Sequence, residues 1–263
     1  MLLLFFAAFL SFLQQLGGVP LQDFYQTVDL LSETISVHCI RSNASPNNKK
    51  VDVLLLHGAK FSAKTWERYG LKSLFVDIKL FKLFKCFVYS ILISIGTLEK
   101  LSDSGFTAIA IDLPGSGSTE SLKNDHQPHI ILERIIKSLG LSRPVIISPS
   151  KSGLYSLDYL LRNPDGVAAY IPIAPVFPEN FTNFSSELPT SDIAKALALV
   201  PAFVVWGSLD TPGKRRSKVL LNVFPKALPF EIENGSHPCY LDQPDMFNRA
   251  VTAFLASRPS AKL

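Results

Sequence analysis

Three residues of this 263-residue chain have the types and positions that covalent acyl transfer requires: Ser150, Asp210 and His237. Ser150 follows a short apolar run, residues 144–147, of the kind that forms a buried parallel strand. Residues 154–161 come after it, with apolar positions spaced as on a helix. A strand, a sharp turn and a helix form a nucleophile elbow, which holds a reactive hydroxyl above a sheet. The sequence therefore predicts that Ser150 is a nucleophile.

The elbow has an unusual composition. Its usual pattern is Gly-x-Ser-x-Gly, but Ser148 and Ser152 stand where the two glycines would be. Serine is small enough for the turn, so the pattern is weakened and not lost. The hexapeptide alone also fits a serine-rich loop between a strand and a helix, with Ser148 as a helix cap. Residues elsewhere in the chain must decide between the two interpretations.

An acid and a histidine follow in the order that such enzymes use, nucleophile, acid, histidine. Asp210 ends a predicted strand at 201–210, and His237 lies in the loop after a predicted strand at 228–233. Taken singly, they fit a turn aspartate and a surface histidine. Three suitable groups in this order, each just after a strand, indicate a catalytic triad. Asp242, five residues beyond His237, competes with Asp210 for the role of the acid.

The loop that stabilises the oxyanion should follow residues 51–56, a predicted buried strand that leads into His57 and Gly58. In an elbow enzyme the next amide, at Ala59 or Lys60, donates to the oxyanion, and the amide of Lys151 is the second donor. We choose Ala59 and Lys151. We expect His57 to brace this loop and to take no part in catalysis.

The predicted elements alternate in type, which indicates an α/β fold with a doubly wound, mainly parallel sheet. Only 25 residues, 176–200, are left for a cap, so we expect a minimal one. We place the domain at residues 34–258. Further predicted strands cover 34–40, 107–111 and 169–175, and further predicted helices cover 130–139 and 247–255.

Composition narrows the function. Hydrophobic residues make up 47% of the chain and charged residues 18%, which is typical of a globular protein and excludes a disordered one. The net charge of +4 is mild and comes with no nucleic-acid-binding motif, so we expect no nucleic-acid partner. The three cysteines lack metal-ligand spacing. We expect no metal and a monomer.

Two segments lie outside the predicted pattern. Residues 1–18 begin with an almost unbroken apolar run that is similar to the core of a secretory signal, although no basic residues precede it. A functional signal would place the protein in the secretory pathway or anchor it to a membrane; the alternative is a cytoplasmic protein. Residues 71–96 form an insertion rich in Phe, Ile, Leu and Lys. It is a membrane-touching helix, a lineage-specific elaboration or retained non-coding sequence, and we favour the last. Membrane contact is expected, if anywhere, through 1–18 or 71–96.

These features together resemble the α/β-hydrolases, and more narrowly the α/β-hydrolase domain-containing protein 14 family. The resemblance rests on five stretches: 54–58, 65–66, 110–115, 147–153 and 237–242. A serine-flanked elbow is usual in that family, and the family's triad falls on Ser150, Asp210 and His237.

The resemblance implies a serine hydrolase that acts on small acyl esters or acetyl-lysine peptides. It implies no required cofactor, with coenzyme A as an acyl acceptor besides water. The alternative is a catalytically silent module that keeps this fold for protein interactions. The three intact residues argue against it, because a scaffold has no need of all of them.

Overall fold

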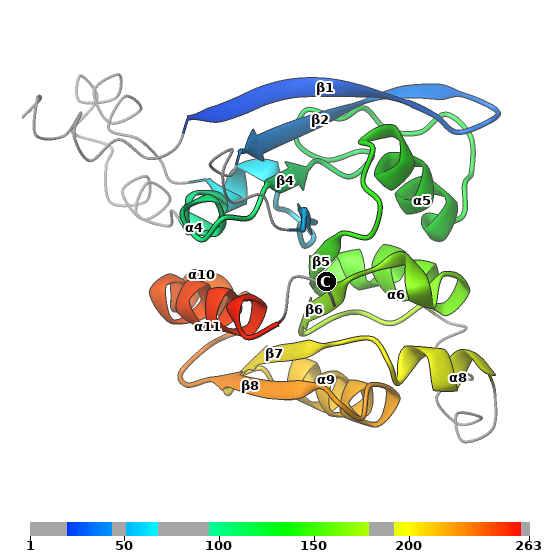
Figure 1. Ribbon diagram of the computed structural model, residues 1–263. Helices are drawn as coiled ribbons and strands as arrows, with labels where there is room; N and C mark the ends of the chain where they lie inside the picture. The colour runs from blue at the N-terminus through cyan, green and yellow to red at the C-terminus, as the bar shows by residue number, and fades with distance from the viewer. Residues whose placement is uncertain (1–19, 44–50, 68–94, 179–191, 259–263) are drawn as a thin grey trace, which may run out of the picture.

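The computed structural model describes residues 20–43, 51–67, 95–178 and 192–258, and these are built around one eight-stranded sheet (Figure 1). Its spatial order is β1-β2-β4-β3-β5-β6-β7-β8. The strands are β1 (Leu21–Asp29), β2 (Thr34–Ser42), β3 (Val53–Leu55), β4 (Ala108–Ile111), β5 (Val145–Pro149), β6 (Ala169–Ile173), β7 (Phe203–Gly207) and β8 (Leu228–Ile232).

The six strands β3 to β8 run parallel to one another. β1 and β2 form an antiparallel hairpin, and β2 joins the sheet by pairing antiparallel to β4. The chain passes from β3 outward to β4 and then crosses back to β5 on the other side of β3. Such a switch of direction leaves a crevice at the carboxyl ends of the two diverging strands, where open α/β sheets bind ligands. Here those strands are β3, which leads into Gly58, and β5, which leads into Ser150.

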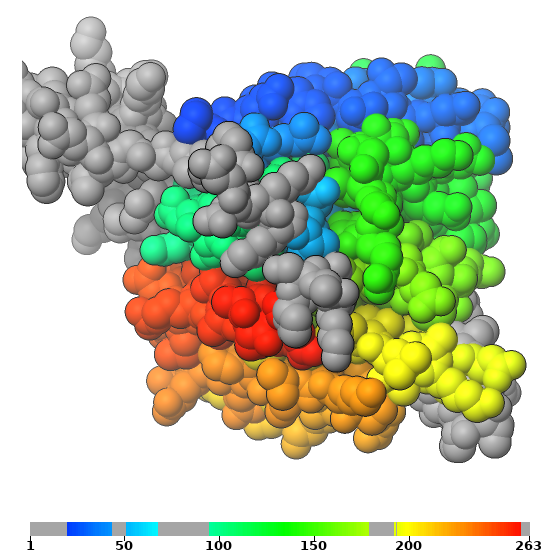
Figure 2. Space-filling model, in the orientation of Figure 1, coloured from blue at the N-terminus to red at the C-terminus, as the bar shows by residue number. Residues whose placement is uncertain are grey.

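Helices cover both faces of the sheet, and each face has its own apolar core. One core contains side chains of α5 (Pro128–Ser138), α6 (Gly153–Arg162) and α9 (Thr211–Val223), together with Leu197 of α8 (Asp192–Leu197). The other contains α4 (Thr97–Asp103) and α11 (Pro244–Ala256), with the fully buried Trp66 of the short helix η2 (Ala63–Trp66). Figure 2 shows α11, in red, lying between the α4 region and the β7–β8 end of the sheet. Two covered faces explain why the central strands are apolar without alternation.

The predicted fold class is therefore confirmed: the sheet is doubly wound and mainly parallel. The predicted strands correspond to β2 to β8, with ends that differ by at most three residues: 34–40, 51–56, 107–111, 144–147, 169–175, 201–210 and 228–233. β1 was not predicted. Within the expected cap, 176–200, residues 179–191 lie outside the described part of the chain, and α8 is the helix that follows them.

Two predicted segments also fall largely outside the described residues: 1–18 entirely, and 71–96 except for Ile95 and Gly96. Ile95 is 4% exposed and belongs to the core that contains α4. The Gly96 amide donates a hydrogen bond to the Glu67 carbonyl at 3.4 Å, so the described residues on either side of 68–94 lie next to each other. Among the described helices, none has both the length and the apolar character needed to cross a membrane.

Candidate active site

Ser150 lies at the turn between β5 and α6, as the elbow pattern predicts. Its φ of 50° is in the left-handed region, which residues other than glycine rarely adopt. β5 is hydrogen-bonded to β3 on one side and to β6 on the other, and a 3₁₀ turn, η4 (Ser150–Ser152), leads directly into α6. A strained turn persists only when its surroundings hold it, and such turns cluster at functional sites.

The two serines that replace the elbow glycines are part of a buried chain of hydroxyl groups. Ser148 Oγ lies 3.0 Å from Ser152 Oγ and 2.7 Å from Ser156 Oγ on α6. Ser156 Oγ lies 2.9 Å from the Tyr170 hydroxyl on β6, and Ser152 Oγ donates to the Pro149 carbonyl. A buried hydroxyl is costly unless it is hydrogen-bonded, so this chain is what permits serine in place of glycine beneath the nucleophile.

The three predicted triad residues meet in one line of hydrogen bonds. His237 Nε2 lies 2.7 Å from Ser150 Oγ, and His237 Nδ1 lies 2.5 Å from Asp210 Oδ2. The Asp210 side chain is 6% exposed, whereas the His237 side chain is 41% exposed. The histidine can therefore receive a substrate from solvent, while its carboxylate partner is shielded from water.

Two glycines allow this approach. The Gly213 amide donates to Asp210 Oδ1 at 3.0 Å, and a Cβ atom on Gly213 would lie 1.9 Å from Asp210 Oδ2. A Cβ atom on Gly207, at the end of β7, would lie 2.2 Å from the carbonyl oxygen of Gly235 in the loop that carries His237. The acid and the histidine are thus placed by close backbone contacts that any larger residue would prevent.

The competing acid, Asp242, does not pair with His237. Its Oδ2 atom accepts hydrogen bonds from both the amide and the hydroxyl of Ser236, each at 2.6 Å, and so shapes the loop just before the histidine. Cys239 is fully buried, and burial raises the pKa of its thiol to about 12. The thiol therefore stays protonated at neutral pH and is not a nucleophile.

The expected oxyanion loop lies against the elbow. A Cβ atom on Gly58 would be 3.5 Å from Ser150 Cβ, and the next residue, Ala59, is exposed. Among the described residues the Ala59 amide has no hydrogen-bond partner, so it is free to donate to a ligand. Lys151 directly follows the nucleophile in the 3₁₀ turn η4.

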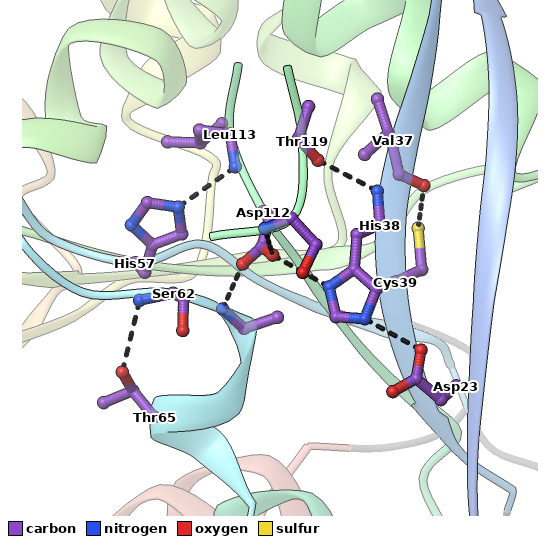
Figure 3. Close-up of polar contacts among 12 residues, drawn as sticks. Asp23, Val37, His38, Cys39, His57, Ser62, Thr65, Asp112, Leu113 and Thr119 are labelled. Carbon is purple, nitrogen blue, oxygen red and sulfur yellow. Dashed lines mark hydrogen bonds and ion pairs between the residues drawn. The ribbon is translucent and has the colours of Figure 1, made fainter. Parts of the chain in front are cut away.

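His57 braces this loop, as expected. Its Nδ1 atom donates to the Gly58 carbonyl at 2.8 Å, and its Nε2 atom accepts from the Leu113 amide at 3.0 Å (Figure 3). Burial lowers the pKa of His57, and the neighbouring Lys151 acts in the same direction. A neutral imidazole is what these partners require, because Nε2 must keep its lone pair to accept.

A second buried pair, Asp112 with His38, holds the far end of this loop and was not predicted from the sequence. Asp112 Oδ1 accepts from the Ala63 amide at 2.6 Å, where η2 begins, and Oδ2 accepts from the Ser118 amide at 2.8 Å. His38 Nδ1 lies 2.8 Å from Asp112 Oδ2 (Figure 3). Asp112 therefore ties the loop after β3 to the loop after β4.

No group of three or more His, Cys, Asp and Glu side chains within the described ranges is placed to hold a metal ion. The described site is a serine, a histidine and an aspartate joined in one line of hydrogen bonds, and this arrangement suits acyl transfer.

No family model matches the chain, but curated proteins are similar to it over most of its length. Protein ABHD14A of Danio rerio is 32% identical over 210 residues, which are 79% of this chain and 65% of the zebrafish protein. The Pongo abelii protein named "Putative protein-lysine deacylase ABHD14B" is 30% identical over 210 residues, 77% of this chain and 82% of that protein. The chain thus spans slightly less than two thirds of the zebrafish relative.

A solved structure shares the architecture. The crystal structure of a "predicted CIB-like hydrolase" from Thermoplasma acidophilum superimposes with a TM-score of 0.66 at 19% sequence identity, over 91% of this chain and 100% of that one. At this level of identity the similarity concerns the fold.

Proposed function

The chain belongs to the ABHD14 family of α/β-hydrolases, and on that premise we propose that it is a serine hydrolase of short-chain acyl esters or acyl-lysine. The observation that carries this proposal is the hydrogen-bonded line from Ser150 through His237 to Asp210. A strained elbow beneath the serine and a free amide at Ala59 support it.

In the first half-reaction, His237 Nε2 accepts the proton of Ser150 Oγ as that oxygen attacks the acyl carbonyl carbon. Asp210 Oδ2 accepts a hydrogen bond from the Nδ1–H group of His237, which keeps Nε2 unprotonated and aimed at the serine. The charge on the carbonyl oxygen is stabilised by the amides of Ala59 and Lys151. His237 then donates its proton to the departing alcohol or amine, which leaves an acyl group on Ser150.

In the second half-reaction, His237 takes a proton from the acceptor, which attacks the acyl carbonyl. The intermediate collapses, and His237 returns the proton to Ser150 Oγ. Water as acceptor gives a carboxylic acid, and coenzyme A gives a thioester. The family resemblance suggests both acceptors, and the products distinguish them.

The substrate class follows from the relatives and from the site. The orangutan relative carries the name of a protein-lysine deacylase, which supports an acyl-lysine peptide as one substrate. The exposed His237 supports an acyl group presented at the surface, because a peptide cannot enter a closed cavity.

Two separate assays test the proposal: labelling with a fluorophosphonate probe, and hydrolysis of 4-nitrophenyl acetate by the unlabelled protein. Ser150→Ala should abolish both, because no other described hydroxyl is in line with His237. Ser152→Ala is the matched control, since it removes a neighbouring buried hydroxyl and leaves the triad intact. Probe labelling that persists in Ser150→Ala, or that is lost in Ser152→Ala alone, would refute the assignment.

The same experiment separates the enzyme from a non-catalytic interaction module. A module that keeps the fold would show neither labelling nor turnover in the wild-type chain. Acetyl-lysine peptides with and without coenzyme A, analysed by mass spectrometry, would then identify the acceptor.

A further inference from the structure

A surface pocket opens between the loop that follows β3 and the loop that follows β4. Its volume is about 470 Å³, within the range of sites for small ligands. Lys60, Ser62, Lys64 and Thr65 line one side, and Ser116 with its flanking glycines lines the other. Phe61 also lines the pocket, so its walls combine two lysines, hydroxyl-bearing residues and glycines with one aromatic residue.

The pocket lies beside the nucleophile. Phe61, one of its lining residues, is 3.4 Å from the position of a Cβ atom on Gly58. Ser150 Cβ is 3.5 Å from the same position. Phe61 of the pocket and the nucleophile therefore both lie against one glycine, Gly58.

The two walls are held together from beneath. Asp112 accepts from the Ala63 amide on one wall and from the Ser118 amide at the end of the other. Figure 3 shows Asp112 between the start of η2 and the ring of His38. The other ring nitrogen of His38 lies 2.8 Å from Asp23 Oδ1, so each ring nitrogen faces one carboxylate.

The charges of the two lysines at the pocket are not offset by ion pairs within the described part of the chain. Among the described residues, neither Lys60 nor Lys64 forms an ion pair with a carboxylate. Glu67 is the acid nearest to Lys64 along the chain; burial raises the pKa of its carboxyl group, and the charge of Lys64 acts in the opposite direction. Lys151 adds a third ammonium group near the nucleophile, since its charge helps to lower the pKa of His57.

We propose that this pocket is an anion-binding subsite, in which Lys60 and Lys64 bind a carboxylate or phosphate group of the substrate. The proposal rests on the proposed function, and it adds a substrate class: acyl compounds that carry a negative charge a few bonds from the scissile carbonyl. The hydroxyl groups of Thr65 and Ser116 donate to the same anion. The Thr65 hydroxyl proton is available, because its oxygen is the acceptor for the Ser62 amide.

Two pairs of esters, each differing only in one charge, test the proposal in the full-length enzyme. Mono-4-nitrophenyl glutarate and its methyl ester place the charge on the acyl side. 4-Acetoxybenzoate and its methyl ester place it on the leaving group. For each pair we compare the ratio of kcat/KM for the charged ester to kcat/KM for its methyl ester. A substitution that changes the chemical step alone alters both values equally and leaves this ratio unchanged.

Lys64→Gln should lower this ratio about 3- to 5-fold for the pair whose charge enters the pocket, the effect of one exposed ion pair. Lys64→Glu should lower it further, and added salt should reduce the difference. Lys137→Gln, on the exposed face of α5, makes the same change in net charge away from the pocket and should leave the ratio unchanged. Ratios that are the same in wild type, Lys64→Gln and Lys64→Glu for both pairs would overturn the proposal.

A binding measurement separates this proposal from the proposed function. In the Ser150→Ala protein, glutarate and inorganic phosphate should raise the melting temperature, and Lys64→Gln should reduce that rise. Anion binding without ester turnover in the wild type would refute the hydrolase and keep the subsite. Ester turnover with neither anion binding nor a Lys64 effect would keep the hydrolase and refute the subsite.

Discussion

The chain of hydroxyl groups beneath the elbow should be a measurable source of stability, and Ser156 is the residue to change. Its Oγ atom lies between Ser148 Oγ, at 2.7 Å, and the Tyr170 hydroxyl, at 2.9 Å. Both neighbours are fully buried. Ser156→Ala removes the link with little change in volume and leaves the Tyr170 hydroxyl without this partner.

The magnitude follows from what is left unpaired. A buried polar group that loses its partner costs about 1–3 kcal/mol, so Ser156→Ala should lower the free energy of unfolding by that amount. Tyr170→Phe removes the end of the chain, and Ser156 still has Ser148, so it should cost about 1 kcal/mol. The double variant no longer contains the unpaired phenol. The double variant should therefore lose no more free energy of unfolding than Ser156→Ala alone.

Urea unfolding of the four proteins, followed by circular dichroism, gives the double-mutant cycle. We expect a coupling energy of about 1 kcal/mol. Strictly additive costs would show that the two hydroxyls do not act together. A cost of Ser156→Ala below about 0.5 kcal/mol, the usual effect of a neutral surface change, would refute the reasoning that the chain supports the elbow.

Three further changes test other parts of the site. Asp210→Asn should cut kcat on the order of 10⁴-fold, as for the acid of a well-studied triad. Asp242→Asn should have a far smaller effect, because Asp242 contacts Ser236 and not His237. If steady-state kinetics show the reverse order of effects, the two residues exchange their roles. His57, whose pKa burial lowers, is neutral in the folded protein, so the unfolded chain takes up a proton first as the pH falls through about 6.5 and the histidine's contribution to stability is lost below that pH. His57→Asn should flatten the decline of the urea midpoint between about pH 7.5 and about pH 5.5, and an unchanged decline would contradict this. Deletion of residues 71–94, with Ile95 and Gly96 kept, should give a more soluble enzyme with unchanged activity on short esters, because the Glu67 carbonyl and the Gly96 amide are already hydrogen-bonded; loss of folding or of activity would show that the segment is needed.

The parallel strands could be predicted because each is a short apolar run, and a strand buried on both faces needs no polar alternation. β1 gave no such signal. Most of its residues are exposed or half-buried, and Val28 is its one fully buried side chain. An edge strand of this kind is held by its hairpin partner β2, and that pairing is not visible in its own sequence.

The candidate site divides in the same way. Its chemical groups could be predicted, because acyl transfer needs particular residue types after particular strands. The choice between Asp210 and Asp242 could not be made with the same force, since each is a plausible partner by position and only the folded chain brings one of them to His237. The pair of Asp112 and His38 had no local signal at all, because 74 residues separate the two and their strands are paired only in the sheet.

The residues that hold the site differ in kind from those that would do the chemistry. A chain of hydroxyl groups lies below Ser150, and a glycine amide donates to Asp210. The loop after β3 is held by His57 at one end and by the carboxylate of Asp112 at the other. None of these supports touches the position of a reacting atom, and each could be built from other residues. A nucleophile, base and acid have few substitutes, whereas a fixed turn has many. The sequence of a hydrolase therefore shows what reacts more readily than what keeps the reacting groups in line.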